Sequence, residues 1–213
     1  MFIIFPETHK IIAKELQQSI LEDQGIELNE KRVIWGAISP DFLPKYKIYR
    51  HYLEDSIHFV VNEIVGLIYF CRFFNPKKMT GFQRKILSTK VGVISHFLSD
   101  YVCLPHAERW TFDDHFKVHV AYEKELNQRA QGHDFQNAIV DTASLSIDAF
   151  GAVLLKNIVR EYIYDVVTEY QKEKSYKRDL NFALDFNRHI INFVFDTAEA
   201  LYMERTMVKS FVF

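Results

Sequence analysis

Two pairs of metal-binding residue types, each separated by four positions, constrain the local structure of this chain most strongly. His96 and Asp100 lie in the segment SHFLSDYVCLPHAERW, and His119 and Glu123 lie in HVAYE. Residues four apart lie on one face of an α-helix, with Cβ atoms about 5–6 Å apart. Each pair therefore predicts a helix on which an imidazole and a carboxylate, both zinc donors, point the same way.

A third histidine, His106, extends the first pair to H-x3-D-x5-H. Pro105 cannot continue a helix, so we expect His106 to enter from the loop that follows. A single histidine four residues from an acid is most often a surface pair, worth roughly a few tenths of a kcal/mol. Two such pairs, together with a histidine after a helix-ending proline, instead favour a site for divalent metal ions.

Apolar periodicity, with only 7 Gly and 5 Pro in 213 residues, predicts an all-α fold because β folds need many tight turns. No linker or repeat divides the chain, so we expect one domain over residues 1–213. The predicted helices cover residues 8–22, with Thr8 as N-cap and Gly25 after the end, then 48–73, 82–103 and 113–131. One or two long helices are expected in each of 139–174, interrupted at Gly151, and 178–208, with irregular structure over 26–46.

Composition narrows the class of protein further. The formal net charge is −2, which argues against a nucleic acid as the partner because such binding normally needs a basic surface. Cys71 is interpreted as a core thiol and Cys103 as a buried neighbour of the metal site rather than a ligand.

The segment MFIIFPETHK does not have the features of a signal peptide. No run approaches the roughly 18–20 apolar residues of a membrane span. We therefore expect a cytoplasmic location without an integral membrane segment.

Other histidines and one acid are weaker candidate ligands. They are His9 at the start of the first helix, Asp41 in SPDF, His51 in RHYLED, His58 seven residues on, and His115 four before His119. Taken singly, each histidine is more often hydrogen-bonded and partly buried than metal-bound. We interpret His133 in QGHD and His189 in FNRHII as structural.

The segment HFLSDYVCLPHAERW resembles the signature of the zinc-dependent phospholipase C and P1 nuclease superfamily. HVAYE is similar to the family's later H-x3-E ligand pair. RHYLED resembles the segment with an earlier histidine ligand, which selects His51 over His58, and PDF supplies Asp41 upstream of it. THKIIAKEL resembles the first-helix segment with His9, so the resemblance covers residues 8–126 in order.

The resemblance implies a single-domain helical bundle that holds two or three Zn²⁺ ions. By analogy, one ion is held by Asp41, His51, His96 and Asp100, and another by His106, His119 and Glu123. Asp100 would bridge to a further ion shared with His9. In the family a processed N-terminal Trp completes that ion, whereas this chain starts with Met1, so we expect the third site to be weak, empty or completed by water.

The activity implied is hydrolysis of a phosphodiester, such as a phospholipid or a related small phosphoester, by a metal-activated water. Asp41 would ligate first, and orient or deprotonate the attacking water second. Phe42, Tyr46, Tyr49 and Trp110 are candidates for a head-group pocket, although packing is the favoured role. Two alternatives stay open: a non-catalytic metal-binding protein of the same fold, and a single-strand nuclease that uses the Lys and Arg patches at 83–90 and 172–178.

Overall fold

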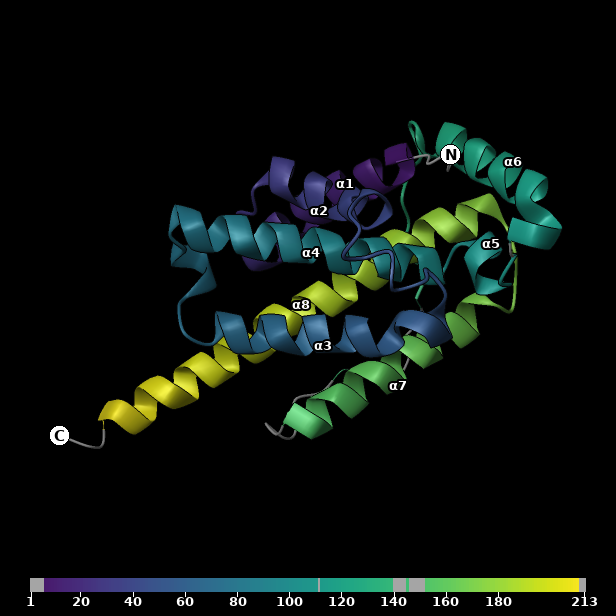
Figure 1. Cartoon of the computed structure of the whole chain (residues 1–213). Coiled ribbons are helices and arrows are strands. Elements are labelled where there is room, and N and C mark those ends of the chain that lie inside the picture. Colours follow the sequence, from purple (N-terminus) through teal and green to yellow (C-terminus); the bar gives the residue numbers. More distant parts are fainter. Residues whose placement is uncertain (1–5, 111, 140–144, 146–151, 211–213) are drawn as a thin grey trace.

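The computed structural model describes residues 6–110, 112–139, 145 and 152–210, and is built from helices (Figure 1). Over these residues no strand forms, so the all-α prediction is confirmed. The elements are α1 (Pro6–Gln24), α2 (Glu30–Phe42), α3 (Leu53–Cys71), the 3-10 turn η1 (Pro76–Lys78), α4 (Gly81–Tyr101), α5 (Leu104–Ala107), α6 (Phe112–Ala130), α7 (Ala152–Tyr170) and α8 (Tyr176–Ser210). None of the helices in the described part of the chain is long and apolar enough to cross a bilayer.

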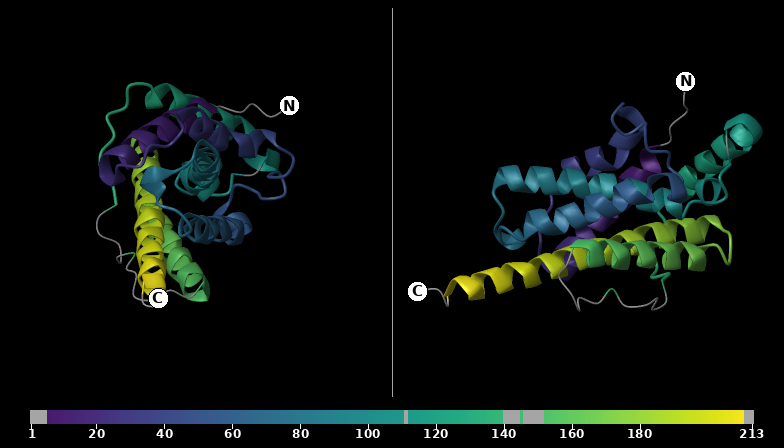
Figure 2. Two further views of the ribbon diagram at one scale, coloured as in Figure 1. Left: turned by 90° about the vertical axis from the view of Figure 1, so that its left-hand side faces the viewer. Right: turned by 60° about the horizontal axis from the view of Figure 1, so that its bottom comes forward.

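Helix α4 lies at the centre of the arrangement and contacts α1, α2, α3, α5 and α8. The left view of Figure 2 shows it end-on, with other helices around it. A capping box between Thr80 and Gln83 starts the helix, and every residue from 91 to 101 is buried. His96 and Asp100 are therefore carried into the interior by the apolar residues that surround them on the same helix.

Helices α2 and α4 cross with their backbones in close contact. A Cβ atom added at Gly92 would lie 2.1 Å from the Val33 carbonyl oxygen, and one at Gly36 would lie 2.2 Å from that of Thr89. Only glycine leaves room for this approach. The crossing holds the last turn of α2, which carries Asp41, against the half of α4 that carries His96.

The expectation of irregular structure over residues 26–46 is wrong for most of that segment, because α2 occupies Glu30–Phe42. The Asn29 side chain caps the helix by accepting the amide of Arg32 at 3.0 Å. Pro40 lies inside the helix and cannot donate to the Gly36 carbonyl. The Ser39 hydroxyl donates to that carbonyl instead, at 3.1 Å, so the helix continues and Asp41 lies in its last turn.

Three other local predictions, two about helix starts and one about His106, are also wrong. Helix α1 begins at Pro6 rather than after Thr8, because a proline suits the first helical turn, and the Thr8 hydroxyl donates to Asn127 at 3.3 Å. Residues 48–52 are not helical, and α3 starts only at Leu53. His106 lies in the one-turn helix α5 and not in a loop, because Pro105 stands in that helix's first turn, where its missing amide costs nothing.

The remaining boundaries agree with the sequence more closely. Helices α4 and α6 lie within two residues of the predicted 82–103 and 113–131, and Gly25 follows α1 with φ +65°. Helix α7 falls within the predicted segment 139–174, although Ile139 lies outside any helix, and α8 extends two residues beyond each end of the predicted 178–208. The interruption predicted at Gly151 lies outside the described residues.

Candidate metal centre

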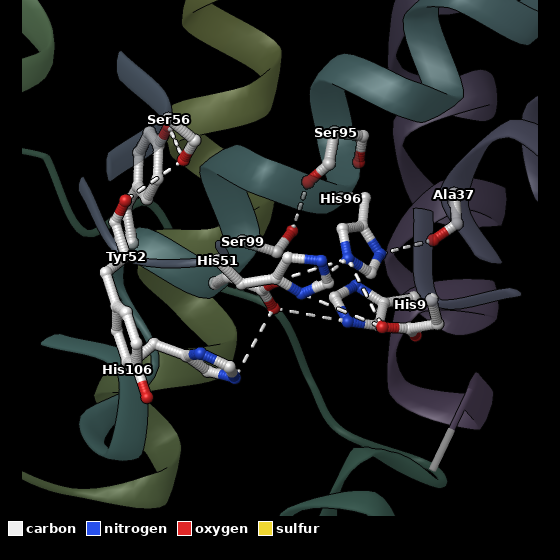
Figure 3. A network of polar contacts seen from close by, with 12 residues as sticks. His9, Ala37, His51, Tyr52, Ser56, Ser95, His96, Ser99 and His106 are labelled. Atoms are coloured by element: carbon white, nitrogen blue, oxygen red, sulfur yellow. Dashed lines mark hydrogen bonds and ion pairs between the residues drawn. The ribbon is translucent and has the colours of Figure 1, made fainter. Parts of the chain in front are cut away.

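The eight side chains predicted as ligands converge on one region. They come from α1 (His9), α2 (Asp41), the turn before α3 (His51), α4 (His96 and Asp100), α5 (His106) and α6 (His119 and Glu123). Their donor atoms form three groups, each within 4.8 Å: His9, Asp41 and His96; His51, His96 and Asp100; and His106, His119 and Glu123. Figure 3 shows the rings of His9, His51 and His96 close together, with the His106 ring further away and joined to the group by a dashed line.

The Asp100 carboxylate lies at the centre of the cluster, and its two oxygens face different histidines. Oδ2 lies 3.0 Å from His51 Nδ1 and 3.2 Å from His96 Nε2, whereas Oδ1 lies 3.3 Å from His9 Nε2. His106 Nε2 is 3.9 Å from Oδ1, on the same side as His9. This is the arrangement of a carboxylate that can bridge two cations.

The Asp100 Oδ2 contacts lack the geometry of hydrogen bonds. Within the described residues this buried oxygen has no hydrogen-bond partner, although two ring nitrogens lie within 3.2 Å of it. A buried polar atom without a partner is costly. A cation between these donors would satisfy the carboxylate and both nitrogens, so the residues present fit a metal ion.

Backbone carbonyls orient two of the histidines. His96 Nδ1 lies 2.7 Å from the Ala37 carbonyl, which can only accept, so Nδ1 carries the proton and Nε2 presents its lone pair to His51 and Asp100. His119 Nδ1 donates to the Trp110 carbonyl at 3.2 Å in the same way. Such partners fix the tautomer of a metal-binding histidine.

In the third donor group, the Glu123 carboxylate contacts both histidines. Its Oε1 lies 2.8 Å from His119 Nε2 and 3.3 Å from His106 Nε2. The i,i+4 spacing of His119 and Glu123 on α6 therefore places both on one face, as the sequence predicts. His106 reaches them from α5, which only the tertiary structure brings beside α6.

Two of the three carboxylates in the cluster, Asp100 and Glu123, are ionised at neutral pH. Burial acts to raise the pKa of Asp100, but the surrounding histidines His96, His106 and His9 outweigh it, and the pKa lies well below its ordinary value. Burial also acts to raise the pKa of Glu123, yet hydrogen bonds with His106 and His119 lower it to about 2. Two negative charges are thus available to offset the charge of the ions.

The histidines differ in their protonation. Burial lowers the pKa of His96 well below its usual range, so this ring is neutral and ready to ligate. Burial also acts to lower the pKa values of His9 and His51, but the nearby Asp100 carboxylate raises both above the ordinary value. Metal binding must displace those protons, so the affinity for zinc is expected to rise with pH over the range in which His9 and His51 lose their protons.

A cavity of about 580 Å³ opens beside the donor atoms. Its wall includes all the clustered residues except the fully buried His96, and two cations, Lys47 and Arg50, lie at its exposed edge. The rest of the wall is largely apolar, from Ile12, Phe116, Val120, Leu126 and Leu180. The centre is therefore open to a ligand, unlike a closed structural zinc site.

The other candidates lie outside the three donor groups. His58 Nδ1 lies 3.5 Å from an Arg160 nitrogen, and the His115 ring stacks on Trp110. His133 and His189 are hydrogen-bonded to Asn181 and Tyr162 respectively, as their structural interpretation predicts. Cys71 and Cys103 are both buried, and Cys103 lines the cavity without joining a donor group.

Three groups that support the metal centre could not be predicted from the sequence. The carbonyls of Ala37 and Trp110 orient histidines, and a backbone carbonyl carries no residue signature. The third is Asp179, at the start of α8 and 2% exposed. A lone acid in the first turn of a helix is common, so nothing marked this residue.

Asp179 hydrogen-bonds to both α5 and α6, the helices that carry the donor group of His106, His119 and Glu123. Its carboxylate accepts the hydroxyls of Tyr122 (2.8 Å) and Tyr170 (2.7 Å) and the Leu104 amide (3.3 Å). Leu104 starts α5, which carries His106, and Tyr122 precedes Glu123 on α6. Burial raises the pKa of Asp179 to about 6, despite the three donors.

We expect Asp179 to make the free energy of unfolding fall as the pH rises from about 4 to 7. The folded protein holds a proton on Asp179 between its ordinary pKa of 3.8 and about 6, where the unfolded chain has released it. A shift of this size corresponds to about 3 kcal/mol. Urea unfolding of the wild type and of Asp179→Asn across this pH range measures the effect, because the asparagine variant should lose most of the fall.

Asp23→Asn is the control with the opposite sign. The hydrogen bond from Arg188 lowers the pKa of Asp23, so its stabilisation is present above pH 3.8 and lost as the pH falls further. Its removal should therefore matter more at neutral than at acidic pH. If the free energy of unfolding depended on pH in the same way for wild type and Asp179→Asn, Asp179 would have its ordinary pKa in the folded protein.

The fold and the donor set define a helical protein with a candidate multinuclear metal centre open to a cavity. The model of the zinc-dependent phospholipase C family matches residues 8–177, which is well over half of the chain, so the chain belongs to this family. No curated protein and no solved structure matches it.

Proposed function

We propose that this protein is a zinc-dependent phosphodiester hydrolase that cleaves a phospholipid, or a related phosphoester, in the manner of a phospholipase C. The observation that carries the proposal is the Asp100 carboxylate, whose two oxygens face different histidines beside an open cavity. We assign two or three zinc ions to the eight residues of the cluster: His9, Asp41, His51, His96, Asp100, His106, His119 and Glu123.

Bound zinc would supply Lewis-acid stabilisation of the phosphoryl charge and a water acidic enough to be deprotonated near neutral pH. The chain's own residues hold and orient the reactants. Asp41 Oδ1 lies 3.7 Å from both His51 Nδ1 and His96 Nε2, so ligation is its first role. Burial raises the pKa of Asp41, whereas the pKa values of Asp100 and Glu123 are lowered. Asp41 is therefore the strongest base among the three carboxylates for accepting a proton from water. Lys47 and Arg50 at the cavity edge attract the phosphate.

Hydrolysis of chromogenic phosphodiesters tests the proposal. Purified protein, loaded with Zn²⁺ and checked by elemental analysis, is expected to cleave p-nitrophenyl phosphorylcholine or bis-p-nitrophenyl phosphate. Chelator should abolish the activity and added Zn²⁺ should restore it. Asp41→Asn should lower kcat more than zinc content if the residue also handles the proton. Fully loaded protein that hydrolyses no phosphomonoester or phosphodiester in a broad panel would instead identify a non-catalytic metal-binding protein.

We also propose that residues 1–213 form one domain. The ligands assigned to the centre come from the segment between α1 and α6, and α8 contacts α1, α3 and α4. Zinc-loaded protein should therefore unfold in a single transition. Two resolved transitions by circular dichroism and tryptophan fluorescence would contradict this.

A further inference from the structure

The segment from Phe42 to Arg50, which we term the cationic loop, combines positive charge with exposed apolar side chains. Its sequence, FLPKYKIYR, contains three cations and no acid. Ile48 is 75% exposed and Phe42 is 47% exposed. The loop stands out from the helices in both views of Figure 2, where it follows α2.

The cationic loop is held in a defined shape by its tyrosines. Tyr49 stacks on Phe59 of α3 with ring centroids 4.1 Å apart, and Tyr46 meets the same ring edge-on at 6.1 Å. Successive backbone hydrogen bonds, from Tyr46 to Leu43 and from Tyr49 to Tyr46, close the turns between them. With the two tyrosines turned towards the core, Ile48 and the lysines face outwards.

The positive charges of the loop are not offset by acids. Among the residues that the structure describes, no ion pair joins Lys45, Lys47 or Arg50 to a carboxylate. Lys45 lies over the Tyr46 ring at 4.5 Å, and Asp55, on the first turn of α3, is paired with Arg109 at 3.1 Å. The loop therefore presents a net positive surface.

The cationic loop also borders the candidate metal centre. Asp41 precedes it and His51 follows it, and both belong to the donor groups. Lys47 and Arg50 line the cavity, whereas Lys45 and Ile48, both exposed, do not. A molecule that lies against Lys45 and Ile48 would thus lie beside the mouth of the cavity.

We propose that the cationic loop docks the protein onto an anionic lipid surface, and so brings the head group of a membrane phospholipid to the metal centre. The inference rests on the proposed function and names the physical form of its substrate. Lysine and arginine near an anionic bilayer are attracted to it, and an exposed isoleucine gains by entering the boundary between head groups and acyl chains. The three cations and Ile48 match these two requirements on one exposed segment.

The test is co-sedimentation of zinc-loaded protein with vesicles of phosphatidylcholine alone or mixed with phosphatidylglycerol. Wild type is expected to bind the anionic vesicles at least about tenfold more tightly, and less so at high salt. Lys45→Gln/Ile48→Ser should weaken this binding about tenfold or more, because it removes one cation and one inserted apolar side chain. Neither residue lines the cavity, so hydrolysis of a soluble chromogenic phosphodiester should not change.

Lys78→Gln/Phe82→Ser is the matched control. Phe82 is 73% exposed and Lys78 is exposed, but both lie near the start of α4, at the opposite end from the metal centre. This variant should bind vesicles like the wild type. Equal losses in both variants, or no preference of the wild type for anionic vesicles, would overturn the docking proposal. Soluble phosphodiesterase activity is measured separately, so its absence would count against the proposed function alone.

Discussion

Replacing Asp100 by Asn is expected to remove most of the bound zinc and to lower phosphodiester hydrolysis by more than about a hundredfold. Groups that only orient a metal ligand already change affinity or activity by about 10–100-fold. Asp100 faces His51 and His96 with one oxygen and His9 with the other, so its charge serves more than one donor group. Zinc content by elemental analysis, together with kcat/KM, measures the loss.

Glu123→Gln is the comparison, and Asp23→Asn is the control. Glu123 contacts His106 and His119, which belong to a single donor group, so its loss should remove less zinc. Asp23 is paired with Arg188 near the far end of α1 from His9, so this variant should keep its zinc. Equal zinc loss in the Asp100 and Glu123 variants, with circular dichroism showing that both are folded, would contradict a bridging role for Asp100.

Replacing Gly92 by Ala is expected to destabilise the protein by about 3 kcal/mol or more and to weaken zinc binding as well. The added Cβ would lie 2.1 Å from the Val33 carbonyl and 2.7 Å from the Ala37 amide, and backbone atoms cannot turn aside as a flexible side chain does. The helices must separate, which draws the Ala37 carbonyl away from His96. Urea unfolding with chelator and zinc titration measure the two effects.

Gly66→Ala is the matched substitution on α3. A Cβ there meets nothing within 4 Å, so alanine should stabilise the helix by about 0.5–1 kcal/mol and leave zinc affinity unchanged. If Gly92→Ala were as stable as Gly66→Ala, the close crossing of α2 and α4 would be wrong. Loss of stability with unchanged zinc affinity would show that the crossing does not position the centre.

The sequence by itself determined the helical class and the local part of the metal centre. Helical periodicity and i,i+4 spacing depend on neighbours within two turns, so α4 and α6, and the pairs His96–Asp100 and His119–Glu123, could be predicted. The H-x3-D-x5-H spacing also pointed to His106, and the family resemblance selected His9, Asp41 and His51; the structure brings all four to the same cluster. Their ligation of zinc, and the catalytic part of Asp41, stay predictions.

The tertiary structure alone decided how the distant parts of the centre meet. Asp41 lies on a helix because the Ser39 hydroxyl replaces the donor that Pro40 lacks, an exchange that a proline-based prediction of irregular structure overlooks. The Ala37 carbonyl reaches His96 only because two glycines let α2 and α4 touch. Which oxygen of Asp100 faces which histidine depends on the packing of α1, α3 and α4. Contacts between residues far apart in the chain follow from packing, and spacing along the chain does not encode them.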